Sequence, residues 1–179
     1  MKRFLSLLPL LCILVPSFTA PAGDAVSSAC AAQSLTGRVT YVFDGDTLEL
    51  VTGTRRVRIR LYGIDAPECG HHDESGQPAG REARRVLEGK VAGRTVTVEV
   101  RDTDQYGRAI GVVRLAGRDI NREMVRDGWA WAYRHYLEGA YASEYFGAEK
   151  AARARRAGLW RQYNPEPPWE FRHRQERAW

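Results

Sequence analysis

The chain has 179 residues, of which 44% are hydrophobic, 27% are charged and 10% are aromatic. This length can bury a full core without metal or disulfide support, and the composition excludes fibrous, collagen-like and low-complexity proteins. The net charge of +5 favours a polyanionic partner, although so small an excess is weak support by itself.

The first segment has the features of a secretory signal peptide. Two basic residues precede a largely apolar run over 4–15, and small residues follow over 19–25. The run is too short to span about 30 Å of hydrocarbon as a helix, so a retained membrane anchor is the weaker alternative. We expect a signal peptide over 1–25, cleaved near 20–25, and a flexible leader over 26–34. The protein is then secreted or periplasmic, with no stable membrane insertion after cleavage.

Export would place the remaining cysteines in a compartment where disulfides form. Removal of the signal peptide removes Cys12 and leaves Cys30 and Cys69, which could be bonded to each other or remain separate thiols. Sequence does not decide between these alternatives, because a bond requires the two Cα atoms to approach within about 7 Å. His71 and His72 beside Cys69 could suggest zinc, but no second ligand pair stands at a recognised spacing.

Three strands are expected at the start of the domain. Apolar and polar residues alternate over 39–43 and again over 48–50, on either side of a glycine-containing turn at 44–46. This pattern is typical of a hairpin. After a second turn, the segment 56–62 alternates aliphatic residues with arginines, so a third strand should bury one face and expose the other.

The rest of the chain mixes helices and strands. Periodicity and turn signals predict, in chain order, a helix over 81–91, strands over 96–100 and 110–115, and helices over 119–127 and 143–157. Strands do not alternate regularly with helices, which disfavours a parallel doubly wound fold. We expect an α+β, mainly β fold: a five-stranded small barrel with about three packed helices over 35–162. A Pro/Trp/Arg-rich C-terminal tail over 163–179 follows, to which the sequence assigns no chemistry.

Carboxylates gather at two places that the hairpin could bring together. Asp44 and Asp46 flank the first turn, and Asp65 and Glu68 follow the third strand. A cluster of carboxylates suits a hard cation such as Ca²⁺, which binds oxygen ligands, better than it suits zinc. Each acid taken alone is more typical of a turn than of a metal site.

Two arginines strengthen the case for chemistry on a phosphate. Arg60 precedes Asp65 on the same strand, and Arg108 follows a turn at the start of another strand. A guanidinium group binds two phosphate oxygens at once and keeps its charge at any working pH. Phosphodiester cleavage builds negative charge on phosphate oxygens, so cations beside a carboxylate that orients water fit this reaction.

Four segments together closely resemble the staphylococcal nuclease-like, or thermonuclease, family: Asp44–Thr47, Arg60–Glu68, Asp104–Arg108 and Asn121–Gly128. The resemblance covers roughly residues 35–160. It implies that the barrel is a five-stranded OB-fold with three helices. It also implies an endonuclease that uses Ca²⁺ to hydrolyse both DNA and RNA to 3′-phosphate products.

The resemblance assigns calcium ligation to Asp46, Asp65 and the backbone carbonyl of Ala66, with Asp44 as an outer carboxylate. Ala66 stands where the best-known member has threonine, which should cost only a hydroxyl contact because the ligand there is the carbonyl. The phosphate-binding arginines correspond to Arg60 and Arg108, and the general base to Glu68. Three tyrosines are expected to contact nucleotides: Tyr106, Tyr133 and Tyr136.

The expected function is therefore that of a secreted, calcium-dependent, sugar-nonspecific nuclease, acting as a monomer on DNA and RNA. The main alternative is a noncatalytic OB-fold module that binds nucleic acid or another polyanion. A third interpretation, a secreted structural or adhesion domain held by a disulfide, explains the export signal and the cysteines only. The enzyme is favoured because such modules can lose the acids and arginines that this chain retains together, namely Asp46, Arg60, Asp65, Glu68 and Arg108.

Overall fold

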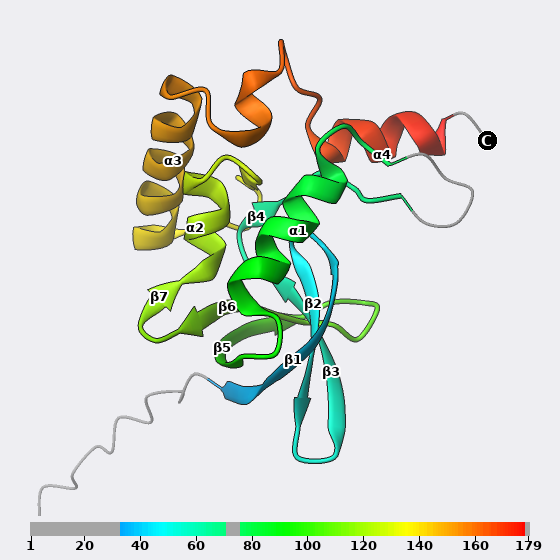
Figure 1. The fold of residues 1–179 in the computed structure, drawn as a ribbon, viewed down its shortest axis with the longest axis vertical. Coiled ribbons are helices and arrows are strands. Elements are labelled where there is room, and N and C mark those ends of the chain that lie inside the picture. Colours follow the sequence, from blue (N-terminus) through cyan, green and yellow to red (C-terminus); the bar gives the residue numbers. More distant parts are fainter. Residues whose placement is uncertain (1–32, 71–75, 178–179) are drawn as a thin grey trace, which may run out of the picture. The chain divides into compact units, whose positions relative to one another are not determined.

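Five long strands form a closed barrel in the computed structural model, which describes residues 33–70 and 76–177 (Figure 1). The strands are β1 (Ser34–Asp44), β2 (Thr47–Thr52), β3 (Arg55–Leu61), β5 (Thr95–Thr103) and β6 (Ala109–Leu115). Neighbours in the order β3-β2-β1-β5-β6 pair antiparallel, and a parallel pairing of β3 with β6 closes the ring. The expected five-stranded OB-type barrel in an α+β fold is confirmed.

The alternation seen in the sequence becomes the inside and outside of the barrel. In β3, Ile59 and Leu61 are buried while Arg56 and Arg58 are exposed, as expected for a strand with one solvated face. Leu48 and Leu50 of β2, Val96 and Val98 of β5, and Val112 and Val113 of β6 are also buried, each at 0–1% exposure.

Helices cover the barrel outside this ring. They are α1 (Gly80–Val91), α2 (Ile120–Arg126), α3 (Gly139–Ala154) and α4 (Pro168–Glu176), with a 3₁₀ turn η1 (Gly158–Arg161). In α1, Ala83, Leu87 and Val91 recur at helical spacing and are buried. Asp119 caps α2 by accepting a hydrogen bond of 2.8 Å from the N–H of Arg122.

The fourth helix was not expected from the sequence, which predicted about three helices and a Pro/Trp/Arg-rich tail over 163–179. Pro168 begins α4 at its first position, where a missing N–H costs nothing. Phe171 of this helix is 7% exposed, and Trp169 packs against Trp131 with ring centroids 6.4 Å apart. Figure 1 shows α4 beside the segment that leads into α1. The tail is therefore an ordered part of the domain.

Three two-residue strands complete the fold: β4 (Ile64–Asp65), β7 (Arg118–Asp119) and β8 (Trp131–Ala132). β4 pairs with β8, which places Asp65 opposite Trp131. The backbone N–H of Tyr133 then donates to the carbonyl of Gly63 at 2.9 Å. This pairing brings the aromatic segment after α2 to the end of β3.

The expected signal peptide, most of the leader and Cys30 lie outside the described residues. The signal peptide and the Cys30–Cys69 bond therefore stay predictions. Across residues 33–70 and 76–177, no helix is both long and apolar enough to span a bilayer.

Candidate active site

The first predicted metal ligand, Asp46, lies in the turn between β1 and β2. Gly45 permits this turn, because a Cβ there would come 2.7 Å from the Cβ of Ala66 and 2.8 Å from that of Ala83. The Asp46 carboxylate, in a residue 1% exposed, accepts hydrogen bonds from the Ala66 N–H at 2.7 Å and the Thr47 hydroxyl at 3.0 Å. Close backbone packing thus holds this acid in one position.

The second predicted ligand, Asp65, is joined to the first by Arg60. Asp65 is 0% exposed, and Arg60 lies opposite Thr47 in the pairing of β3 with β2. Nη2 of Arg60 donates to Oδ1 of Asp65 at 2.7 Å, and Nη1 forms an ion pair with Asp46. The outer acid, Asp44, accepts a hydrogen bond of 3.0 Å from the N–H of Asp46. Burial raises the pKa of Asp44, and the charge of Arg60 opposes this rise.

Glu68, the predicted general base, follows β4 and is tied to the loop before α1. Its N–H donates to Oε1 of Gln77 at 3.1 Å, and its carbonyl accepts from the Gln77 N–H at 2.9 Å. The Glu68 side chain is 32% exposed. An acid that is partly open to water can accept a proton from a water molecule beside it.

A residue that sequence reasoning missed, Arg172 of α4, contacts two of these acids. Its Nη1 donates to Oε1 of Glu68 at 2.6 Å and to Oδ1 of Asp65 at 3.2 Å, and its Nη2 donates to Oδ2 of Asp65 at 2.8 Å. Burial opposes the charge of the guanidinium, but the hydrogen bonds to Asp65 and Glu68 outweigh it and raise the pKa of Arg172. No local pattern pointed to this contact, although Pro168 and the basic last turn are signals for the helix itself.

Arg108 directly precedes β6, whose parallel pairing with β3 brings it near Arg60. Asp104 shapes the preceding turn: its Oδ1 accepts from the N–H groups of Tyr106 at 2.9 Å and Arg108 at 3.0 Å. Its Oδ2 accepts from Nε of Arg108 at 2.6 Å. Among the described residues, no acceptor contacts the two Nη atoms of Arg108. That side of the guanidinium can bind a phosphate.

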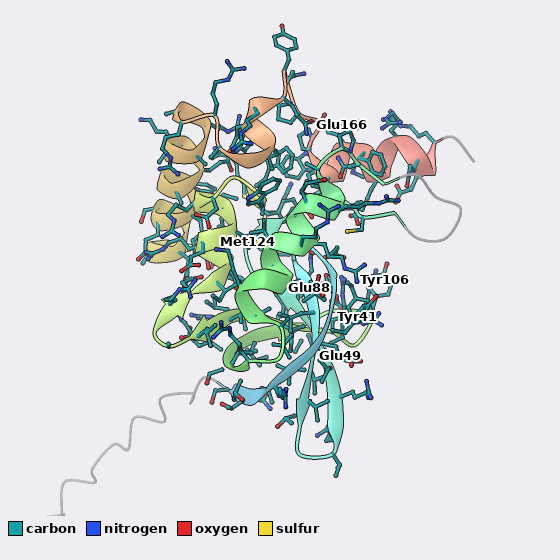
Figure 2. All side chains as sticks on the ribbon, in the orientation of Figure 1. Tyr41, Glu49, Glu88, Tyr106, Met124 and Glu166 are labelled. Atoms are coloured by element: carbon teal, nitrogen blue, oxygen red, sulfur yellow. The ribbon has the colours of Figure 1, made fainter. Side chains whose placement is uncertain are left out.

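A groove of about 640 Å³ gathers the predicted residues on one surface. The predicted site residues that line it are Arg60, Glu68, Arg108, Tyr106, Tyr133 and Tyr136. Tyr106, labelled in Figure 2, is 75% exposed on the turn between β5 and β6. The rings of Tyr133 and Tyr136 lie 5.4 Å apart, centroid to centroid. Asp46, Asp65 and Ala66 are buried, and both aspartates reach the groove through Arg60.

The donor set suits a hard cation, since every predicted ligand is an oxygen. Within the described ranges, no three Asp, Glu, His or Cys side chains converge as a metal-binding group. Ligation would therefore combine Asp46 and Asp65 with the Ala66 carbonyl and water, a mixture that Ca²⁺ accepts. Here Arg60 and Arg172 supply the positive charge beside these buried acids. The residues fit a calcium ion.

The zinc alternative at Cys69 gains no support. The thiol donates to the carbonyl of Gly80 at 3.2 Å, and burial raises its pKa to about 11. Zinc binds the thiolate, which this environment disfavours. His71 and His72 lie outside the described residues.

Known proteins resemble this chain over much of its length. A family model described as "Staphylococcal nuclease homologue" matches residues 58–162. The chain belongs to the staphylococcal nuclease family. An uncharacterized endonuclease of Escherichia coli O157:H7 is 41% identical over 139 residues, covering 77% of this chain and 85% of that protein. A micrococcal nuclease of Shigella flexneri is 37% identical over 151 residues, covering 79% of this chain and 83% of that nuclease.

Membership in the staphylococcal nuclease family identifies the protein as a nuclease and disfavours the noncatalytic barrel module. The matched residues 58–162 contain Arg60, Asp65, Glu68 and Arg108. They end before α4, so Arg172 lies beyond the matched segment.

Proposed function

We propose that this nuclease is a calcium-dependent, sugar-nonspecific endonuclease that hydrolyses DNA and RNA to 3′-phosphate products. The observation that carries the proposal is a groove lined by Arg60, Arg108 and Glu68, in which Arg60 also pairs with two buried aspartates. We further propose that the protein acts as a monomer outside the cytoplasm, in the periplasm or the medium, as its N-terminal segment predicts.

Arg60 and Arg108 bind the scissile phosphate in this mechanism. Arg60 lies on β3 and Arg108 directly precedes β6, which pairs with β3, so two planar cations line one groove. Negative charge grows on the phosphate oxygens as the fifth oxygen approaches phosphorus. Fixed guanidinium groups stabilise this charge without having to reorganise. Their positions therefore favour the transition state over the bound substrate.

Glu68 orients the attacking water and takes its proton. The new bond forms between the water oxygen and phosphorus, and the P–O5′ bond breaks. The 5′-oxygen leaves and takes a proton from solvent water, Glu68 returns its own proton to the solvent, and the 3′-oxygen keeps the phosphate. Asp46, Asp65 and the carbonyl of Ala66 would hold the calcium ion, which polarises the phosphate when bound. Tyr106, Tyr133 and Tyr136 offer aromatic faces to the sugars and bases on either side.

Sugar-nonspecific cleavage is consistent with what lines the groove. The predicted contacts are arginines that bind phosphate and aromatic rings that stack on any base. Such contacts do not distinguish deoxyribose from ribose, whereas a contact to the 2′-hydroxyl would.

Cleavage assays on single-stranded DNA, duplex DNA and RNA, with Ca²⁺ or with chelator, test this proposal. Asp46→Asn and Asp65→Asn keep the side-chain shape and should each lower kcat more than about 100-fold. This loss exceeds the one expected for a residue that only hydrogen-bonds to a metal ligand. The matched control is Glu88→Gln, an exposed acid on α1 labelled in Figure 2, which should behave as wild type. Mass spectrometry of the products should show 3′-phosphates. Chelator-resistant cleavage with both aspartate variants fully active would refute the calcium requirement.

A further inference from the structure

The contact of α4 with the site is the feature that the proposed mechanism does not use. Arg172 places its planar fork on both oxygens of Asp65 and reaches Glu68 with the same Nη1. Oδ1 of Asp65 also accepts from Arg60. Three N–H groups thus occupy the Asp65 carboxylate, although Asp65 is a predicted metal ligand and Glu68 the predicted base.

A metal ion at Asp65 needs the same oxygens. A guanidinium bound to both oxygens of a carboxylate lies in the direction from which a cation would approach. A divalent ion at this position would also repel the nearby positive charge of Arg172, and the buried surroundings of Asp65 strengthen that repulsion. Arg172 and Ca²⁺ should therefore compete for the carboxylate of Asp65, and only one of them should bind it at a time.

The helix that carries Arg172 is short and depends on tertiary packing. It has nine residues, and a helix this short is marginal in water without tertiary packing. Besides Arg172, α4 is held by the buried ring of Phe171 and by Trp169, which packs against Trp131 and Tyr133. Just before the helix, the carbonyl of Glu166 accepts a hydrogen bond of 3.1 Å from Nε2 of Gln77. Loss of the Arg172 contacts removes the charged part of this attachment.

The docked helix also restricts the groove. Arg172 and Glu176 of α4 contribute to its lining, together with Arg108 in front of β6. The carboxylate of Glu176 adds negative charge where a polynucleotide backbone would pass. A docked α4 therefore covers a predicted metal ligand and hinders binding of the polynucleotide in the groove.

We propose that α4 is an autoinhibitory segment, with Arg172 filling the cation position at Asp65 and Glu68 until Ca²⁺ displaces it. The proposal rests on the calcium site of the proposed function. Because linkage is reciprocal, docking of α4 weakens Ca²⁺ binding by the same factor by which Ca²⁺ weakens docking. The protein stays closed where calcium is scarce and opens where it is abundant.

Calorimetric titration of the purified chain with CaCl₂ tests the coupling without using activity. Arg172→Gln should tighten the Kd for Ca²⁺ by roughly 5- to 150-fold, the usual range of such couplings. The matched control is Arg174→Gln, on the same helix, whose side chain is 59% exposed and pairs with Glu166, labelled in Figure 2. Its Kd should equal that of wild type. Arg172→Lys keeps the charge but not the fork and should lie between the two.

Hydrogen exchange of the wild-type chain gives an independent readout. Saturating Ca²⁺ should accelerate amide exchange in residues 168–176 while slowing it around Asp46 and Asp65. Unchanged exchange in α4, or a Kd in Arg172→Gln that equals or exceeds that of Arg174→Gln, would overturn the autoinhibitory role. Absence of Ca²⁺ binding in every variant, together with chelator-resistant cleavage, would instead refute the calcium site itself, and the inference with it.

Discussion

Replacement of Asn121 should destabilise the barrel and disturb the site together. Its side chain is 0% exposed in the first turn of α2. Oδ1 accepts a hydrogen bond of 3.0 Å from the N–H of Val113 in β6. Nδ2 donates to the carbonyls of Tyr62 at 3.0 Å and Gly111 at 3.1 Å. One amide therefore ties α2 to β6 and to the segment that runs from β3 to Asp65.

The cost of Asn121→Ala follows from the groups left behind. The N–H of Val113 loses this acceptor and the carbonyl of Tyr62 loses its donor, whereas the Gly111 carbonyl still accepts from the Tyr62 N–H at 2.8 Å. Each buried group left unpaired costs roughly 1–3 kcal/mol. We expect a loss of about 3 kcal/mol, a large part of the 5–15 kcal/mol typical of a domain. The melting temperature should fall by roughly 6–12 °C.

Urea unfolding followed by tryptophan fluorescence measures this loss. Asn121→Asp provides a second variant, since it keeps the acceptor for Val113 but turns a charged oxygen toward two carbonyls. It should be less stable than Asn121→Ala at pH 7 and recover in part at low pH, where the protonated acid can donate again. An Asn121→Ala protein with the midpoint and slope of wild type would refute this account of the amide.

The other predictions concern charge. Hydrogen bonds from Arg118, aided by Lys90, lower the pKa of Glu123 from 4.5 to about 2. A lowered acid pKa stabilises the fold above about pH 4.5, and this contribution is lost as the pH falls toward 2. Glu123→Gln should thus lose up to about 3 kcal/mol at pH 7, and the difference from wild type should vanish near pH 2 in urea titrations. Arg108→Lys should lower kcat roughly 100- to 1000-fold without changing the melting temperature, because Asp104 keeps its backbone partners. Arg60→Lys should lower both quantities, since one ammonium cannot bridge two buried carboxylates. Steady-state kinetics and thermal melts of the two lysine variants measure these effects. Equal melting temperatures in Arg60→Lys and Arg108→Lys would contradict the expected difference in stability.

The sequence by itself determined the features that depend on local chain chemistry. Alternation predicted the strands because successive side chains of a strand face opposite sides, and helical spacing predicted α1 because residues four apart share a face. The family resemblance predicted a site of Asp46, Arg60, Asp65, Glu68 and Arg108. In the fold, Arg60, Glu68 and Arg108 line one groove, and Arg60 pairs with the two buried aspartates. The turn at Gly45 was also predicted from the sequence, whereas its close approach to Ala66 is a tertiary contact that the structure revealed.

Only the tertiary structure decided how these local elements meet. Arg172 reaches Glu68 across 104 positions of sequence and Asp65 across 107. No periodicity spans such a separation, because the contact depends on how the chain after η1 packs beside the segment that leads into α1. No helix was predicted in the tail because its prolines and charges form no simple apolar pattern. It became a helix because Phe171 and Trp169 find apolar partners, and Arg172 finds buried negative charge that needs a cation.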